Sequence, residues 1–173
     1  MSNDYLDIIG RKKDAKIIYE DDKALAFLPE QASVPGEIVI TPKKPYQIME
    51  QLPDDLIVHL SVLARKLSDR AFELLSGKGT NILIQNGVPA GQDVPQFSIR
   101  ILPRKEGDSV NFTWQTEREE ESELDSAHNI LGEETKNIFI SAMETKHKPI
   151  EEKPKQKEIV SEEGEIDYRL DFL

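Results

Sequence analysis

Short apolar runs separated by polar turn signals fill the first third of the chain. Apolar and β-branched residues dominate 16–19, 24–28 and 37–40. An acidic turn at 20–22 separates the first two runs, and Val34-Pro35-Gly36 precedes the third. Because apolar runs bounded by turn residues are typical of strands, we predict three β-strands within residues 15–52.

A single long helix is predicted after these strands. Residues 54–76 carry leucine and alanine at positions three and four apart, which is the spacing of one helix face. Pro53 and two aspartates precede the periodic stretch and Gly77 follows it, as expected at helix boundaries. His59 falls within this helix, and we interpret it as a surface or boundary histidine rather than a ligand.

Two more strands, at 80–85 and 94–102, are predicted after the helix. In the second of them, residues 97, 99 and 101 are apolar and should pack under the helix, because alternate residues of a strand face opposite sides. Gln96, Ser98 and Arg100 should face the other side. Strands, one long helix and strands again indicate an α+β domain with an antiparallel sheet, which we assign to residues 1–114.

A helical extension is expected at 115–145. Apolar residues recur at helical spacing through 116–144 across a break at Gly132, which predicts a pair of helices after an acidic start. Their apolar stripe must be buried against something. Packing on the first domain and packing against a second copy of the chain are the two alternatives.

The last segments differ in composition from the rest. Residues 146–165 are polar, contain two prolines and lack the apolar content to fold alone, which predicts a flexible acidic linker. Residues 166–173 alternate apolar and charged side chains, the period of a half-buried strand. This anchor strand would pair with the protein's own sheet, with a second subunit, or with a different protein. Its expected contact residues are Ile166, Tyr168, Leu170, Phe172 and Leu173.

The formal net charge of −11 is concentrated in the carboxy-terminal third. Residues 1–114 contain 14 basic and 16 acidic residues, a balance of −2, whereas residues 115–173 contain 8 and 17, a balance of −9. An acidic tail is usually a solvated segment. Its charge repels phosphate, so nucleic acid is an unfavourable partner.

Several classes of protein are disfavoured by composition. The chain has no cysteine, hence no disulfide and no cysteine zinc site, and acidic and histidine residues do not cluster with metal-ligand spacing. No cofactor is expected. No apolar run is long enough to cross a bilayer, and the first residues do not resemble a signal peptide. We therefore expect a cytoplasmic protein.

The stretch from residue 86 to residue 104, NGVPAGQDVPQFSIRILPR, carries the most specific motif. It resembles the signature of the histidine triad (HIT) superfamily of nucleotide hydrolases and transferases: Asn-Gly, Ala-Gly-Gln, three alternating histidines, then apolar-Pro-Arg. The resemblance covers roughly residues 5–114. It implies a HIT-like fold that commonly dimerises, and a nucleotide cleft on the strand face that holds Gln96, Ser98 and Arg100.

Those three residues occupy the positions of the family's histidines. In the family, the middle histidine attacks a nucleotide α-phosphate. The serine hydroxyl of Ser98 needs an adjacent base to act as a nucleophile, and no His, Asp or Glu alternates with it on this strand. Arg100 stays protonated, so it cannot act as a base. The resemblance therefore implies a degenerate member, and we predict no catalytic residue.

Two more departures concern the cleft. Pro45 occupies the place where many members have a histidine, and Pro29 occupies the place of a carboxylate that binds ribose. Glu30 is a weak substitute for that carboxylate. The polar groups that could still bind a nucleotide or phosphate are Asn86, Gln92, Ser98, Arg100 and Arg104. For Arg100 the alternative is that it fills a vestigial cleft or pairs with an acid, and for Arg104 that it closes the strand end with a salt bridge.

Two classes of function remain open. The first is a catalytically inactive, dimeric HIT-like pseudoenzyme, acting as an interaction or regulatory module through its acidic extension and tail. The second is a nucleotide-handling protein, either a sensor or an enzyme with relocated catalytic groups. The replaced histidines favour the first class, and Asn86, Gln92 and Arg104 favour the second. A shared fold does not decide between them.

Overall fold

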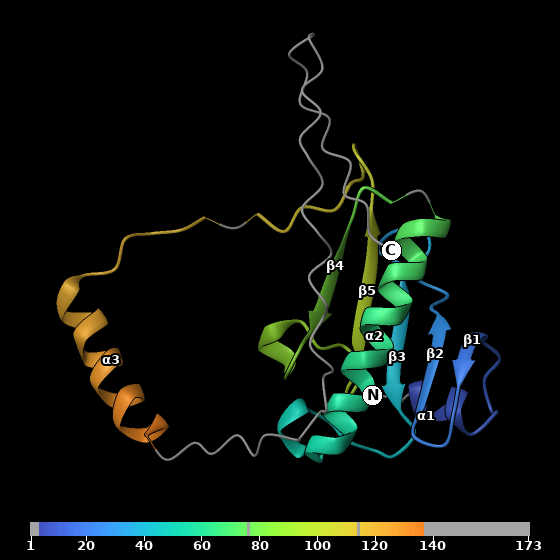
Figure 1. Ribbon diagram of the computed structural model, residues 1–173, viewed down its shortest axis with the longest axis horizontal. Coiled ribbons are helices and arrows are strands. Elements are labelled where there is room, and N and C mark those ends of the chain that lie inside the picture. The colour runs from blue at the N-terminus through green and yellow to red at the C-terminus, as the bar shows by residue number, and fades with distance from the viewer. Residues whose placement is uncertain (1–3, 76, 114, 137–173) are drawn as a thin grey trace, which may run out of the picture. The chain divides into compact units, whose positions relative to one another are not determined.

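The computed structural model describes residues 4–75, 77–113 and 115–136 (Figure 1). It contains two compact units, residues 1–114 and residues 115–173, which are described separately. The described residues of the first unit form two α-helices, five strands and two short 3-10 helices. In chain order these are α1 (Asp4–Ile9), β1 (Lys16–Glu20), β2 (Ala24–Leu28), β3 (Ile38–Pro42), η1 (Met49–Gln51), α2 (Asp54–Leu74), β4 (Gly79–Ile84), η2 (Val88–Ala90) and β5 (Ile99–Arg104).

The five strands form one antiparallel sheet in the order β1-β2-β3-β5-β4. β3 and β5 therefore lie side by side although α2 and β4 separate them in sequence. Their register places Ile38 opposite Ile101 and Val39 opposite Arg100. Strands β1 and β4 are the two edges of this sheet.

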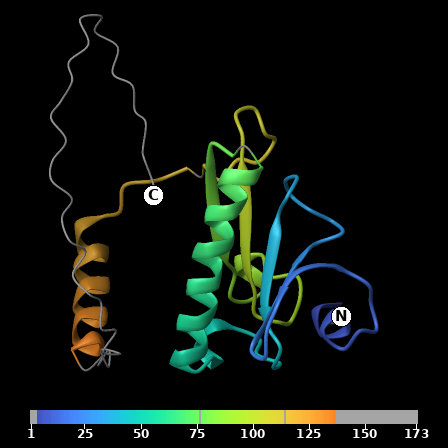
Figure 2. The same ribbon diagram turned by 45° about the vertical axis from the view of Figure 1, so that its right-hand side comes forward.

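The main core lies between α2 and one face of the sheet. Leu56, Leu60 and Leu63 of α2 are buried there with Phe97 and the isoleucines of β3 and β5. Figure 2 shows α2 lying along this face. The helix forms here because its apolar residues recur every three or four positions and are covered by the sheet.

The opposite face of the sheet is covered by the short helix α1. Ile8 is buried against Leu25, Phe27 and Val39, and Tyr5 meets Phe27 edge-on with ring centroids 5.4 Å apart. In Figure 2 this dark blue helix lies beyond the strands from α2. The face that carries Arg100 is thus a second, smaller core, and α1 forms part of its wall.

The predicted α+β fold, with an antiparallel sheet and one long helix, is confirmed. Phe97, Ile99 and Ile101 pack under α2 as expected. The predicted strand at 94–102 begins later, because β5 starts at Ile99. The sequence did not predict α1, whose six residues are too few to show a helical period.

In the second unit the structure describes one helix, α3 (Glu121–Thr135), within the predicted extension 115–145. The predicted break at Gly132 is wrong, because α3 continues through this glycine. Most of the second helix predicted after Gly132 lies outside the described residues. The predicted linker at 146–165 and anchor strand at 166–173 also lie outside the described residues.

Candidate functional site

The loop between β4 and β5 is held by the side chain of Gln92. Its Oε1 accepts a hydrogen bond from the Gly87 amide at 2.7 Å, and its Nε2 donates to the carbonyl oxygens of Gln47 and Val94 at 2.8 and 3.0 Å. Gly91 adopts a left-handed conformation, φ +85°, and a Cβ there would lie 2.6 Å from Gln85 Nε2. This loop therefore requires glycine at 91, and its glutamine amide is used internally.

Asn86, at the start of the same loop, joins it to η1. Its Oδ1 accepts a hydrogen bond from the Met49 amide at 3.2 Å, and its Nδ2 donates to Glu50 Oε1 at 3.3 Å. The structure thus brings Asn86 and Gln92 together, and both side chains fix the loop conformation. That they bind a ligand stays a prediction.

Gln96, at the first of the three triad-like positions, is buried and links its own loop to residues 42–44. Its Nε2 donates to the carbonyl oxygens of Pro42 and Lys44, each at 3.0 Å. The side chain is 1% exposed. Its amide nitrogen therefore binds backbone oxygen rather than facing an open cleft.

Ser98, at the second position, lies beside the Tyr5 phenol of α1. Burial, followed by the negative charge of Asp93, raises the pKa of Tyr5. Since a tyrosine titrates near 10 even when unperturbed, this phenol is protonated at neutral pH and cannot serve Ser98 as a base. The Tyr5 phenol therefore leaves the serine unactivated.

Arg100, at the third position, forms an ion pair with a buried carboxylate. Its Nε and one terminal nitrogen each lie 2.6 Å from Glu37 Oε1, and the same terminal nitrogen donates to Ser33 Oγ at 3.2 Å. The Glu37 side chain is 0% exposed and its second oxygen accepts the Ser33 amide at 2.6 Å. The positive charge at this position is therefore neutralised inside the protein.

Arg104 lies at the far end of β5 from Ser98. Six residues of strand separate the two, which is roughly 20 Å at the usual rise per residue. Its guanidinium binds both oxygens of Asp108 at 2.6 and 2.7 Å, donates to Asn81 Oδ1 at 2.6 Å, and lies over the Phe112 ring. Arg104 thus fixes the segment after β5, and the structure does not bring it to the other predicted ligand-binding residues.

A cavity of about 510 Å³ opens between α1 and the end of β2. Pro29 and Glu30, the residues at and beside the family's ribose-binding position, both line it. Tyr5, Ile8 and Phe27 give it an apolar wall. Four carboxylates and two lysines also line it: Asp4, Asp14, Glu30, Asp93, Lys13 and Lys16. Because acids outnumber bases and Lys13 is bound to Asp4 at 2.8 Å, the lining disfavours a polyphosphate.

His59 lies outside this region and contacts a single carboxylate. Its Nε2 is 2.8 Å from Asp21 Oδ2, which also accepts the Tyr19 hydroxyl at 2.7 Å. Asp21 Oδ1 accepts the amides of Lys23 and Ala24. Within the described ranges no three His, Asp or Glu side chains gather as metal ligands would. His59 therefore stabilises the turn between β1 and β2 and the start of α2.

Acid stability should depend on Asp21. Burial opposes its ionisation, but the hydrogen bonds from Tyr19, the two amides and His59 outweigh burial and lower its pKa from 3.8 to about 2. A lowered pKa gives stability that is full above the unfolded value and is lost as pH falls from about 4 to about 2. Between about pH 4 and about pH 2, we expect the free energy of urea unfolding to fall on the order of 2 kcal/mol more for the wild type than for Asp21→Asn. Equal losses in the two proteins would contradict this role.

Three residues of the cleft, Tyr5, Ser33 and Glu37, were not predicted from the sequence. Tyr5 lies in the helix that was missed, and Glu37 was interpreted as the first residue of a strand. The sequence does hold one signal for Glu37, because this acidic residue stands between the turn Val34-Pro35-Gly36 and the apolar run 38–40. Its partner Arg100 is 63 residues away, so no local pattern connects them.

Comparisons with known protein families identify the family to which this fold and the loop between β4 and β5 belong. The HIT domain model matches residues 10–107, more than half of the chain. This protein therefore belongs to the HIT family. An uncharacterised HIT-like protein of Methanocaldococcus jannaschii is 36% identical over 101 residues, covering 58% of this chain and 78% of that protein. An asymmetrical bis(5'-nucleosyl)-tetraphosphatase of Schizosaccharomyces pombe is 29% identical over 94 residues, covering 54% of this chain and 52% of that enzyme.

Solved structures of HIT proteins share this fold. A HIT family protein from Bacillus subtilis superposes with a TM-score of 0.70 at 25% identity, covering 82% of this chain and all of that one. A histidine triad nucleotide-binding protein from Candida albicans superposes with a TM-score of 0.69 at 25% identity, covering 78% and 98%. Some HIT relatives of this chain are thus nucleotide hydrolases or nucleotide-binding proteins. None of the helices in the described ranges is long and apolar enough to cross a membrane.

Proposed function

We propose that this protein is a catalytically inactive HIT protein that serves as an interaction or regulatory module. The Arg100–Glu37 pair is the observation that carries this proposal. A histidine triad needs a neutral imidazole nucleophile and partners that meet phosphate. At the aligned positions this chain has a glutamine amide that donates to backbone carbonyls, a serine beside a protonated phenol, and an arginine paired with a buried acid.

The test is turnover of the substrates that HIT enzymes use. Diadenosine triphosphate, diadenosine tetraphosphate and adenylyl sulfate would each be incubated with wild type and with Ser98→Ala. We expect both proteins to give the rate of the buffer blank, because Ser98 has no base. Turnover by wild type that Ser98→Ala lacks would overturn the proposal and identify Ser98 as a relocated nucleophile.

A second candidate function is nucleotide sensing without turnover. The observation that favours it is the cavity beside α1, which is adjacent to the loop of Asn86 and Gln92 through Asp93 and Val94. The name of the Candida albicans neighbour, a nucleotide-binding protein, supports it as well. Against it stand the acidic lining of the cavity and the internal use of Gln92 and Arg100.

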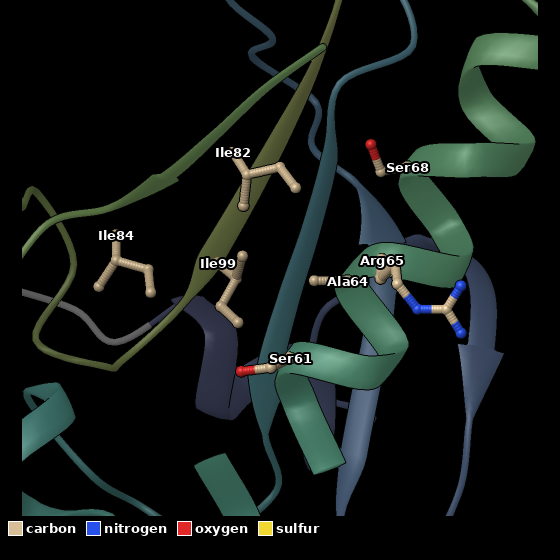
Figure 3. Close-up of a pocket in the computed structure, with 7 residues that line it drawn as sticks. All are labelled: Ser61, Ala64, Arg65, Ser68, Ile82, Ile84 and Ile99. Atoms are coloured by element: carbon tan, nitrogen blue, oxygen red, sulfur yellow. The ribbon is translucent and has the colours of Figure 1, made fainter. Parts of the chain in front are cut away.

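We also propose that the protein is a homodimer, assembled through the face formed by α2 and the edge strand β4. Ile82 and Ile84 are 49% and 40% exposed, and their strand partners Ile101 and Ile99 place them on the α2 side of the sheet. A groove of about 280 Å³ separates them from α2 (Figure 3). Its lining consists of Ser61, Ala64, Arg65, Ser68, Ile82, Ile84 and Ile99.

The same face continues along α2. Val58 and Val62 are 43% and 44% exposed, and they share a helical stripe with Arg65, which lines the groove. An exposed edge strand beside an apolar patch is prone to aggregate unless a partner covers it. Two copies related by a twofold axis would pair their β4 edges antiparallel and cover both patches at once. A cytoplasmic location remains a prediction from composition.

A further inference from the structure

The cavity between α1 and the end of β2 has the size of a ligand-binding site. Its volume of about 510 Å³ lies within the range of about 300–1,000 Å³ that is usual for such sites. Its lining residues do not include Gln96, Ser98 or Arg100, so the contacts at the triad-like positions do not fill it. The cavity is therefore a candidate binding site next to those positions.

Apolar and acidic groups lie at different depths of this cavity. Ile8 and Phe27 line it and are only 5% and 2% exposed, because they belong to the small core under α1. Three carboxylates that line it are exposed to solvent, and they are called the mouth acids: Asp14, Glu30 and Asp93. The cavity thus has an apolar floor and an acidic mouth.

The negative charge of the mouth is not neutralised by the lysines that line the cavity. Lys13 is paired with Asp4 at 2.8 Å, which leaves the three mouth acids against one lysine, Lys16. None of the ion pairs formed by the described residues includes a mouth acid. Since charges of one sign around a cleft raise the local concentration of ligands of the opposite sign, the mouth favours a cation.

We propose that this cavity binds a small organic cation, a primary amine carried on an apolar body. The apolar body contacts Ile8 and Phe27, which removes its surface from water. The ammonium group stays at the mouth beside Glu30 and Asp93. A neutral ligand of the same shape lacks the attraction to the mouth acids, and an anion is repelled by them.

The order of the two parts favours a free molecule over a protein side chain. A lysine side chain would enter with its ammonium first and would bring that charge to the floor formed by Ile8 and Phe27. Burying a charge among apolar groups without a partner is unfavourable. A small amine can enter with its apolar body first, so that its charge remains hydrated and close to the mouth acids.

The test uses the full chain and four small probes. The first, 2-phenylethylamine, carries both an apolar body and an ammonium group. In 2-phenylethanol and phenylacetate the charged end is neutral and negative, respectively, and ethylamine keeps the ammonium but lacks the ring. NMR titration, followed at the backbone amides of the lining residues Ile8 and Val94, would give the Kd of each probe.

Two double variants separate the mouth from the rest of the surface. Glu30→Gln/Asp93→Asn leaves two acids and two lysines around the cavity, a balance of zero. Asp22→Asn/Glu106→Gln is the matched control, because it removes two exposed acids of the first unit that do not line the cavity. Both variants keep the acidic residues of 115–173, so general attraction of the amine to that region is the same in each.

We expect wild type to bind 2-phenylethylamine at least about fivefold more tightly than each of the other three probes, as two exposed ion pairs allow. Glu30→Gln/Asp93→Asn should bring the amine and the alcohol within twofold of each other, and the control variant should keep the wild-type ratio. Equal binding of amine and alcohol, equal binding of the two amines, or an unchanged ratio in the mouth variant would overturn the proposal.

Adenosine monophosphate is the competing ligand. If it shifts the same amides with a lower Kd than 2-phenylethylamine does, the cavity is a nucleotide site and the proposal is wrong. Amine binding and nucleotide turnover are independent results, because Ser98 does not line the cavity.

Discussion

Replacing Arg100 with alanine is expected to lower the free energy of unfolding by about 3–5 kcal/mol. The substitution would remove the positive charge that is paired with Glu37. Glu37 has a fully buried side chain and would lose both short contacts to the guanidinium, keeping only the Ser33 amide. An uncompensated buried charge is among the costliest defects that one substitution can create. Urea unfolding at neutral pH, followed by circular dichroism, measures the loss.

The control for this prediction is another arginine in an ion pair. Arg70 lies 2.5 Å from Glu73, but the two side chains are 67% and 48% exposed, so Arg70→Ala should cost at most about 1 kcal/mol. The double variant Glu37→Gln/Arg100→Ala should recover part of the loss, because it removes the buried charge along with its partner. If Arg100→Ala costs no more than Arg70→Ala, the cleft is open to water and the pair does not fill it.

Replacing Ile82 and Ile84 together by glutamate is expected to convert a dimer into a monomer. In the proposed assembly four isoleucines from two copies lie at the paired β4 edges, so the substitution would bury four glutamates without partners. Both side chains are 40% exposed or more in the single chain, which leaves the new charges solvated in a monomer. Sedimentation should give twice the chain mass of 19.7 kDa for wild type and one chain mass for the variant.

The opposite edge of the sheet offers the matched control. Ile18 of β1 is 44% exposed, so Ile18→Glu makes the same chemical change on the other edge strand. This variant should sediment as wild type does. A monomeric wild type would contradict the assembly, and a dimer that survives the β4 substitutions would place the interface elsewhere.

Local patterns in the sequence were sufficient for the sheet and for α2. Long periodic stretches were predicted correctly because burial on one face dictates them. The start of β5 was placed too early, since residues 94–98 look apolar enough for a strand. In the structure Gln92 and Gln96 bind carbonyl oxygens of this loop and of 42–47, which replaces a strand ladder with side-chain contacts. Hydrogen bonds of this kind produce no periodic pattern of apolar and polar residues in the sequence.

The cleft was less accessible to prediction because its groups come from distant parts of the chain. Glu37 and Arg100 are 63 residues apart, and Tyr5 reaches Ser98 from a helix of only six residues. The alternative that Arg100 pairs with a nearby acid, and that Arg104 closes the strand end, agrees with the contacts of both side chains. A motif identifies the residues present at a site, whereas their partners depend on the tertiary fold.

The central claim is that internal contacts fill the cleft at the triad-like positions, and nucleotide titration tests it most directly. Adenosine and guanosine monophosphate would be added to the full chain while the backbone amide resonances of Gln92, Ser98 and Arg100 are followed by NMR. We predict no saturable shift of these resonances up to millimolar nucleotide. Saturable shifts of all three with a Kd below one millimolar would contradict the claim and make the protein a nucleotide-binding HIT protein.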